Sequence, residues 1–297
     1  MKAAASPRSL GLPLGRSLAL DRGPLVMGIV NVTPDSFYAR SRLRTALEAA
    51  EAALAMEAEG AALVDLGGES TRPGSEAVGE QEELERVIPA VEAIRARSSV
   101  PISVDTRKAA VAAAAIAAGA DIVNDISALS FDPAMAALVA RSGTAVVLMH
   151  MRGEPRTMQE DPSYADCAAE VASFLAAAAE RALAAGIARD RIVLDPGIGF
   201  GKRLEDNLDL LARLGLVAAL GYPVLVGLSR KRIVGALTGR GVDGRLAGSL
   251  GAACAAFEAG ARIFRVHDVS ETVDALAVFA ASRGAAARLE PRGEAGS

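Results

Sequence analysis

The chain has 297 residues, 51% hydrophobic and 23% charged, which is enough to bury one large core or two smaller ones. Its net charge of −4 and its lack of tryptophan argue against a nucleic-acid partner, since such proteins use basic surfaces and aromatic stacking platforms. No apolar run reaches the roughly 18 residues of a membrane span, and Cys167 and Cys254 fit no metal-site spacing. We therefore expect a cytoplasmic protein with reduced thiols and without nucleic-acid or membrane partners.

The first 23 residues do not follow the pattern of the rest of the chain. Arg16 interrupts their short apolar part, which argues against a signal peptide. We interpret 1–23 as an N-terminal extension.

From residue 24 onward, one unit recurs: a short apolar or β-branched run, a polar residue at its end, and a longer stretch rich in Ala, Leu and Glu. Continuous apolar runs of this length are typical of strands buried on both faces of a parallel sheet. The runs predict eight strands, within 24–31, 61–68, 100–106, 120–127, 144–150, 191–197, 222–229 and 261–268.

The stretches between these runs have the composition and periodicity of amphipathic helices, most clearly at 43–59, 80–97, 165–186 and 245–259. Eight such units without a break in composition predict a (β/α)8 TIM barrel, a single domain over 24–284, close to the roughly 250 residues typical of that fold. An open sheet of eight strands is the alternative. The polar, Gly- and Ala-rich segment 285–297 predicts a disordered tail.

Every predicted strand ends in a polar or ionisable side chain. Because the carboxyl ends of parallel strands meet at one edge, where barrel enzymes carry their active sites, we expect these side chains to converge. Helix capping would explain single Asp, Asn or Ser residues there, but not His, Lys and Arg at the same level. The candidate residues are Asn31, Asp65, Asp105, Asn124, His150, Asp195, Ser229, Lys231, Arg265 and His267.

The types of these residues restrict the ligand. Asp105, Asn124 and Asp195 combine carboxylates with an amide, which suits a flat heterocycle bearing N–H donors, because an ionised carboxylate can only accept. Lys231 suits a ring carbonyl or a ring nitrogen.

The positive charge nearby suits an anion. Arg72, Arg265 and His267 fit a phosphate or a pyrophosphate. Asn31 is a neutral oxygen ligand of the kind found in water-rich Mg²⁺ sites, so we expect Mg²⁺ as cofactor.

Eight motifs in a fixed order resemble the dihydropteroate synthase family. They are "NVTPDSF", "GGESTRPG", "SVDT", "NDIS", "VLMHMRG", "DPGIGFGK", "GLSRK" and "RVHDV", spread over roughly 24–279. The resemblance implies condensation of 6-hydroxymethyl-7,8-dihydropterin pyrophosphate with 4-aminobenzoate, giving 7,8-dihydropteroate and pyrophosphate in folate synthesis by an SN1-like displacement. It also implies a homodimer.

The resemblance further implies a role for each candidate residue. The pterin would be held by Asp105, Asn124, Met149, Asp195, Phe200, Lys231 and Arg265. The aminobenzoate and the loops that close on it would involve Phe37, Thr71, Arg72, Pro73, Ser229 and Lys231. The pyrophosphate would meet Asn31, Arg72, Arg265 and His267, with Asn31 also on the metal. The residues implied to be catalytic are Asn31, Asp105, Asp195, Lys231, Arg265 and His267.

Simpler roles remain open for some of them. Met149 and Phe200 have an alternative as core residues. For His150 and Asp65 we expect supporting roles, with Asp65 hydrogen-bonded to loop backbone.

One loop departs from the family pattern. After the phenylalanine the family usually continues Ser-Asp-Gly-Gly, whereas here 38–41 reads Tyr-Ala-Arg-Ser, followed by Arg42 and Arg44. The lost glycines would have allowed a sharply turning loop. The arginines have two interpretations: contacts to pyrophosphate or to the benzoate carboxylate, or solvated charge at a helix start.

Two other functions remain as alternatives. One is a pterin-binding paralogue whose altered loop has lost the condensation and which acts as a binding or partner subunit. The other is an aldolase-like barrel using Lys231 as a Schiff-base amine.

Overall fold

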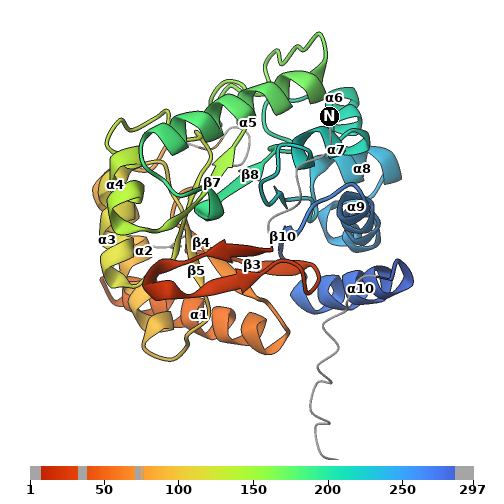
Figure 1. The fold of residues 1–297 in the computed structure, drawn as a ribbon. Helices are drawn as coiled ribbons and strands as arrows, with labels where there is room; N and C mark the ends of the chain where they lie inside the picture. The colour runs from red at the N-terminus through yellow and green to blue at the C-terminus, as the bar shows by residue number, and fades with distance from the viewer. Residues whose placement is uncertain (1–7, 33–38, 71–74, 76, 285–297) are drawn as a thin grey trace, which may run out of the picture.

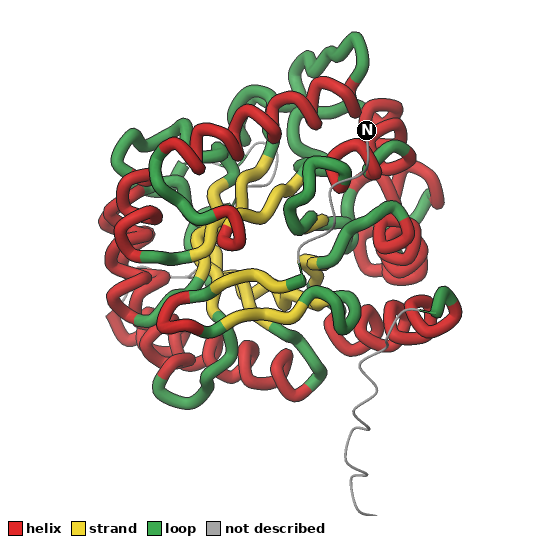
Figure 2. The backbone as a smooth tube through the Cα atoms, viewed as in Figure 1, coloured by secondary structure: helices red, strands yellow, loops and turns green. Residues whose placement is uncertain are grey.

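Eight parallel strands form the centre of the molecule, and helices surround them (Figures 1 and 2). The computed structural model describes residues 8–32, 39–70, 75 and 77–284, with the backbone alone over 39–44. The strand order is β8-β7-β6-β5-β4-β3-β10-β9. A parallel bridge between Leu194 and Val224 joins the two outer strands, and Leu194 N donates to Pro223 O at 2.9 Å. This nearly closed barrel confirms the TIM-barrel prediction.

Each barrel strand lies inside a run predicted from the sequence. The strands are β3 (Leu25–Asn31), β4 (Leu63–Gly67), β5 (Ile102–Asp105), β6 (Ile122–Asp125), β7 (Ala145–Met149), β8 (Ile192–Asp195), β9 (Leu225–Val226) and β10 (Ile263–Val266). Most of their residues are buried, as strands covered on both faces require. The strands β3 and β10 pair in parallel and bring the two ends of the domain together.

The helices occupy the outer layer. They are α1 (Ala39–Ala58), α2 (Glu80–Arg95), α3 (Ala109–Ala118), α4 (Met135–Ser142), α5 (Cys167–Ala184), α6 (Leu204–Ala212), α7 (Gly215–Ala218), α8 (Arg232–Thr238), α9 (Leu246–Glu258) and α10 (Val269–Ser282). The described residues also form the short 3-10 helices η1 (Pro13–Gly15), η2 (Arg189–Arg191) and η3 (Val242–Gly244). Buried Ala, Val, Leu and Ile residues fill the space between helices and strands.

The segment that we interpreted as an N-terminal extension includes a small antiparallel hairpin of β1 (Ser9–Gly11) and β2 (Ser17–Ala19). Its leucines Leu10, Leu12, Leu18 and Leu20 are buried in one cluster with side chains from the amino-terminal ends of the barrel strands. The hairpin therefore closes the floor of the barrel, opposite the strand ends expected to carry the site.

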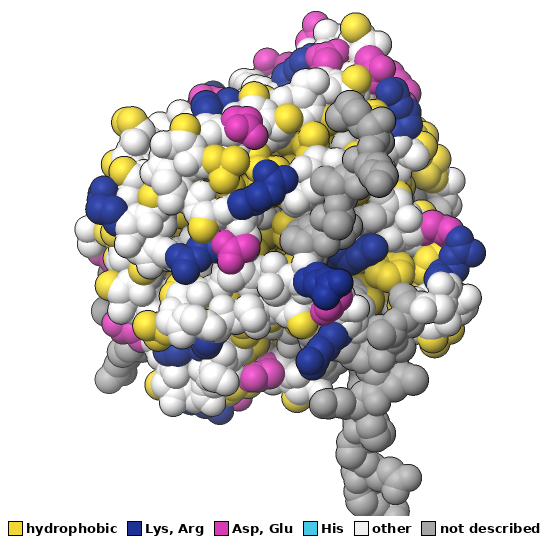
Figure 3. Space-filling view, viewed as in Figure 1, with side chains coloured by type: hydrophobic (Ala, Val, Ile, Leu, Met, Phe, Trp, Pro, Cys, Tyr) yellow, Lys and Arg dark blue, Asp and Glu magenta, His cyan; other side chains and the backbone are white. Residues whose placement is uncertain are grey.

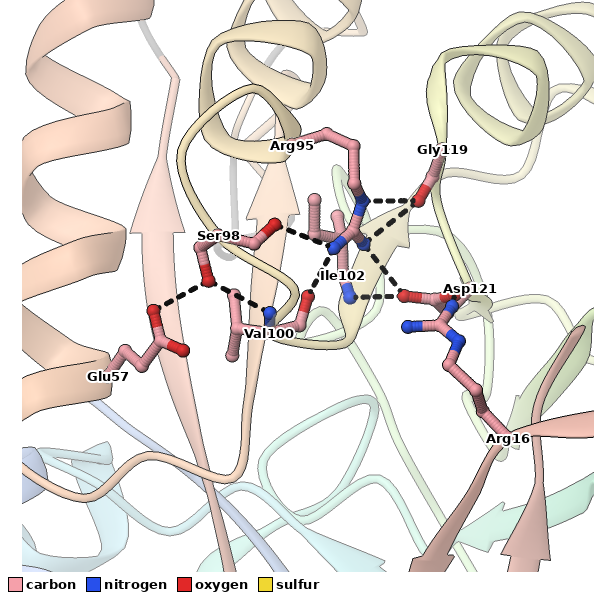
Figure 4. A network of polar contacts seen from close by, with 8 residues as sticks. All are labelled: Arg16, Glu57, Arg95, Ser98, Val100, Ile102, Gly119 and Asp121. Atoms are coloured by element: carbon pink, nitrogen blue, oxygen red, sulfur yellow. Dashed lines mark hydrogen bonds and ion pairs between the residues drawn. The ribbon is translucent and has the colours of Figure 1, made fainter. Parts of the chain in front are cut away.

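A polar network fastens this hairpin to the barrel (Figure 4). Asp121, immediately before β6, is 2% exposed and forms ion pairs with Arg16 from the hairpin and Arg95 from the end of α2. The same carboxylate accepts from the backbone N–H of Ile102 at 3.0 Å. Arg95 also donates to the carbonyls of Gly119, at 3.0 and 3.2 Å, and Val100, at 3.0 Å. One carboxylate thus joins four segments.

The outer surface carries mixed charge. On the face drawn in Figure 3, Lys and Arg side chains are scattered among Asp and Glu. Exposed ion pairs of this kind contribute roughly 0–1 kcal/mol each, so we expect stability to come from the buried core and the buried Asp121 network. Within the described residues, no helix is both long enough and apolar enough to cross a membrane.

Candidate active site

The carboxyl ends of the barrel strands open into one cavity of about 800 Å³. The last residues of the strands line this cavity because a parallel arrangement places all of them at the same edge of the barrel. Of the predicted site residues, the cavity is lined by Asn31, Asp105, Asn124, Met149, Asp195, Phe200, Ser229, Lys231, Arg265 and His267. The structure therefore brings together every described residue to which the resemblance assigns a substrate or a catalytic role, whereas the candidates Asp65 and His150 do not line the cavity.

Four predicted residues cannot be placed. Phe37, Thr71, Arg72 and Pro73 lie outside the described residues. Their roles stay predictions.

Asp65 is the centre of the deepest part of the site. It is 0% exposed, and its carboxylate accepts from Ser103 Oγ at 2.6 Å and from Arg265 Nε at 2.6 Å. Asn124 Nδ2 lies at 3.3 and 3.4 Å from its two oxygens. The partners that the structure describes for the Asp65 carboxylate are side chains from neighbouring strands, and its expected bond to loop backbone stays a prediction. Asp65 thus orients an arginine and an amide that both line the cavity.

The contact with Asp65 fixes the orientation of the Asn124 amide. A carboxylate such as that of Asp65 only accepts, so Asn124 must turn its NH₂ group towards it and its Oδ1 away. Oδ1 is buried and has no hydrogen-bond partner among the described residues. A buried acceptor without a partner costs about 1–3 kcal/mol, so this oxygen is suited to an N–H donor of a ligand.

Two further carboxylates face the cavity. Asp105 accepts from Arg265 Nη2 at 3.1 Å, and Asp195 accepts from the backbone N–H of Gly197 at 2.7 Å. Burial raises the pKa of Asp105 to about 8 against the opposing charge of Arg265, with the Asp65 carboxylate adding to the rise. Burial likewise raises the pKa of Asp195. Both carboxyl groups are almost wholly buried, and in such surroundings their ionised forms attract N–H donors more strongly than they would in water.

Lys231 reaches the same cavity from the turn after β9. Its Nζ lies 4.1 Å from the centre of the Phe200 ring, a cation–π contact. Burial lowers the pKa of Lys231 to about 8, although the charge of Asp195 opposes this. The lysine therefore remains a donor near neutral pH while losing its proton more easily than an exposed lysine.

The turn before Lys231 has a backbone conformation that residues other than glycine rarely adopt. Arg230 has a φ of 55°, in the left-handed region. Its backbone N–H donates to Ser249 Oγ at 2.9 Å, and its guanidinium donates to Asp268 at 2.6 and 3.0 Å. These contacts hold the strained turn that directs the chain to Lys231, a feature that the sequence analysis did not identify.

Ser229 and His267 form the rim of the site. Ser229 Oγ lies 3.1 Å from His267 Nδ1 and also accepts from the backbone N–H of His267 at 3.2 Å. This pair connects the ends of β9 and β10. The His267 imidazole and the Arg265 guanidinium both line the cavity, as a site for an anion would require.

Asn31 ends β3 with an exposed side chain that lines the cavity. Among the described residues, no group of three or more His, Cys, Asp or Glu could hold a metal ion. A single neutral oxygen ligand fits Mg²⁺ only if substrate phosphates and water supply most of the coordination, which is the usual arrangement for that ion. The site thus fits a Mg²⁺ that arrives with a pyrophosphate.

His150 does not line the cavity, in agreement with a supporting role. It is buried and its Nδ1 lies 2.9 Å from Nζ of Lys202. Lys202 does line the cavity and was missed, because the motif "DPGIGFGK" drew attention to its glycines. The only sequence signal was a lysine placed directly after a tight, glycine-rich loop.

The predicted arginine-rich loop is partly helix. The helix α1 begins at Ala39, four residues earlier than predicted, so Arg40, Arg42 and Arg44 belong to its first turns. Positive charge there is unfavourable by about 0.3–1 kcal/mol per residue at the positive end of the helix dipole. Their side chains lie outside the described residues, so both interpretations of these arginines stay open.

Comparisons with known proteins agree with this geometry. Residues 27–267 match the family model of the pterin binding enzymes. The chain is 48% identical over 271 residues to dihydropteroate synthase of Escherichia coli strain K12, covering 91% of this chain and 95% of that one. Two solved structures are similar over nearly the whole chain. The Xanthomonas albilineans dihydropteroate synthase with 4-aminobenzoic acid has a TM-score of 0.85 and 49% identity, covering 94% of this chain and 99% of that one. The Yersinia pestis dihydropteroate synthase in a sulfonamide drug complex has a TM-score of 0.87 and 46% identity, covering 93% and 100%.

Proposed function

The chain belongs to the dihydropteroate synthases of the pterin-binding enzyme family, and from this membership we propose how its own residues perform the condensation. The substrates are 6-hydroxymethyl-7,8-dihydropterin pyrophosphate and 4-aminobenzoate. The main support for the assignment of residues is the convergence of two buried carboxylates and the unpartnered Asn124 Oδ1 on one cavity.

The pterin lies in the deep part of the cavity. Asp195, Asp105 and Asn124 Oδ1 accept hydrogen bonds from its ring N–H and amino groups, and Lys231 donates to its ring oxygen or nitrogen. Met149 and Phe200 form apolar walls. Asp65 fixes the Nε of Arg265, so that the guanidinium stays in register with the pterin face and with the pyrophosphate.

The bond that breaks joins the pterin methylene carbon to the pyrophosphate oxygen. Arg265 and His267 stabilise the negative charge that builds on the departing pyrophosphate. The carboxylates around the ring stabilise the positive charge left on the pterin, which favours a dissociative, SN1-like displacement. The aniline nitrogen of 4-aminobenzoate then attacks the carbon and loses a proton, and its placement near Ser229 and Lys231 matters more than base catalysis.

Asn31 is the residue that would hold a Mg²⁺ ion on the pyrophosphate. When bound, the ion supplies further charge stabilisation to the leaving group. The homodimer stays a prediction from the family resemblance, and the cytoplasmic location stays a prediction from the sequence composition.

Pterin affinity is expected to pass through a maximum near pH 8. Asp105, whose pKa burial raises to about 8, must lose its proton to accept, so affinity rises as pH approaches that value. Lys231, whose pKa burial lowers to about 8, loses its positive charge above that pH, so its hydrogen bond to the ring acceptor weakens and affinity falls. Calorimetric titration of the pterin pyrophosphate from about pH 6 to 10 measures both limbs. Asp105→Asn should flatten the acid limb alone, whereas an affinity independent of pH in the unmodified chain would contradict these roles.

The proposed function is tested by mixing the purified chain with Mg²⁺, pterin pyrophosphate and 4-aminobenzoate and following pyrophosphate release. Release that depends on both substrates is the expected result. Pterin binding without release at any aminobenzoate concentration would favour the non-condensing paralogue. Trapping of a carbonyl compound on Lys231 by borohydride would favour the Schiff-base alternative.

A further inference from the structure

Lys202 buries its ammonium group inside the loop that joins β8 to α6. The residue is 2% exposed, and Nζ donates to the carbonyls of Gly197 at 2.9 Å and Phe200 at 3.1 Å. Its third short contact is with Nδ1 of His150, at 2.9 Å. An ammonium has three N–H donors, so these three acceptors satisfy it completely.

When Lys202 is charged, His150 is the acceptor in this arrangement. Burial, together with the charge of Lys202, lowers the pKa of His150 to about 3, so the imidazole is neutral. Its lone pair faces Lys202 at Nδ1, which places its proton on Nε2. The end of β7 and the loop after β8 are thereby joined through one lysine.

Burying a lysine ammonium without an ion-pair partner costs folding free energy. None of the ion pairs found among the described residues includes Lys202, and burial lowers its pKa to about 7. Taking an ammonium out of water costs several kcal/mol unless its partners compensate for the lost hydration. Local features that cost stability are concentrated at functional sites, and this lysine lies next to residues assigned to the pterin.

The loop around Lys202 is too tightly packed to be held by side chains of its own. Gly197 and Gly201 have φ values of 64° and 60°, and a Cβ on them would lie 1.9 Å from His150 O and 2.2 Å from Arg152 O. The loop therefore runs directly against the chain that follows β7. Its carbonyls converge on a single point and would repel one another without a donor between them.

This loop carries Phe200 and contacts two other residues assigned to the pterin, Asp195 and Lys231. The Gly197 N–H holds the Asp195 carboxylate at 2.7 Å. The Phe200 ring lies under Lys231 Nζ at 4.1 Å, and the Phe200 carbonyl is itself a ligand of Lys202. A shift of the loop would displace the Phe200 ring and would disturb both the Asp195 carboxylate and the Lys231 ammonium that contact the loop.

We propose that Lys202 is a positioning residue for the pterin subsite, whose buried ammonium holds residues 196–201 in the shape that places Phe200 under Lys231 and fixes Asp195 through Gly197. The inference rests on the proposed function, because the loop contacts matter only if the pterin binds there. The unmodified chain is therefore assayed first, and pterin binding with pyrophosphate release by that chain tests the proposed function separately.

The test replaces Lys202 by Met, which keeps the length of the side chain and removes its charge and donors. The dissociation constant of the pterin pyrophosphate, measured by calorimetry, should rise about 10- to 100-fold, since a misplacement of about 1 Å can cost that much. The KM for 4-aminobenzoate should change less than the pterin dissociation constant because, among its expected contacts that the structure describes, only Lys231 touches this loop. A merely structural lysine would not divide the two substrates in this way.

Tyr164→Phe is the matched control. The Tyr164 hydroxyl donates to Gly201 O of the same loop at 2.7 Å but contacts neither Phe200 O nor Gly197 O. Its loss should change pterin affinity by less than about threefold, a net hydrogen bond being worth about 0.5–1.5 kcal/mol to stability rather than to the ligand.

A double-mutant cycle with Phe200→Ala examines the route of the effect. If Lys202 acts through Phe200, the double variant should bind pterin only slightly less tightly than the single variant that has lost more affinity. Fully additive losses would overturn the placing of Phe200 by Lys202, and a pterin dissociation constant within twofold of the unmodified chain in Lys202→Met would overturn the whole proposal. Lys202→Gln, which keeps two donors, replaces Lys202→Met if that variant does not fold. Failure of both variants to fold would assign Lys202 to stability alone and would also overturn it.

Discussion

Replacement of Asp195 by Ala is expected to weaken pterin binding by about 10³-fold. The carboxylate is buried, held by the Gly197 N–H, and assigned to N–H donors of the pterin ring. Truncating one partner of a buried, charged hydrogen-bonded pair costs about 2–5 kcal/mol, and each 1.4 kcal/mol is a factor of ten. Calorimetry with the pterin pyrophosphate measures the loss, and pyrophosphate release should fall with it.

Arg40→Ala gives the contrasting variant. Arg40 lies in the first turn of α1, at the part of the chain that departs from the family pattern. We expect this change to alter mainly the dependence of the rate on 4-aminobenzoate and to leave pterin affinity close to that of the unmodified chain. Equal losses of pterin affinity in both variants would contradict the division of the cavity into two subsites.

Replacement of Asp121 by Ala should lower the free energy of unfolding by about 1.5–3 kcal/mol, the usual value of a hydrogen bond to a charged group, because the carboxylate is buried while its arginine partners are partly exposed. The change leaves the Arg95 guanidinium with fewer partners and the Ile102 N–H without its carboxylate acceptor. It also releases Arg16, so the hairpin that covers the barrel floor loses its polar contact with β6 (Figure 4). Urea denaturation followed by circular dichroism measures the change.

Glu51→Ala is the control for this experiment. Glu51 pairs with Arg97, just beyond the end of the same helix α2, but both side chains are largely exposed. Its removal should cost less than about 1 kcal/mol, as surface pairs usually do. A similar loss of unfolding free energy in Asp121→Ala and Glu51→Ala would show that the Asp121 network has no special role in holding the hairpin against the barrel floor. The pterin affinity of folded Asp121→Ala should be unchanged, because the network and the cavity lie at opposite ends of the barrel.

Much of the fold could be predicted because parallel barrel strands leave a strong pattern. A run such as 144–150 is continuously apolar, since helices on one face and the barrel interior on the other both exclude water. The boundaries were less certain. Residues 39–42 were expected in a loop but form the start of α1, where the surrounding residues favour helix strongly enough to include the arginines.

The N-terminal segment was harder to interpret. Leu10 and Leu18 carry no strand-length apolar run, and a two-stranded hairpin is marginal by itself, so nothing local predicted β1 and β2. Their stability comes from the apolar floor of the barrel, which does not exist until the strands have closed. The same holds for Arg16, whose partner Asp121 is 105 residues away in the sequence.

The sequence by itself determined the fold class and the types of side chain at the carboxyl ends of the barrel strands. Both can be read from local runs of residues, because each run shows where a strand lies and which residue ends it. It placed Asp105, Asn124, Asp195, Lys231 and Arg265 at one edge before any contact was known. Only the tertiary structure decided which of these groups pair. Arg265 meets Asp65 across 200 residues of sequence, and Lys202 turns back into its own loop to meet His150. Such partners depend on distances of a few tenths of an ångström, which closure of the barrel sets and no pattern of residue types records.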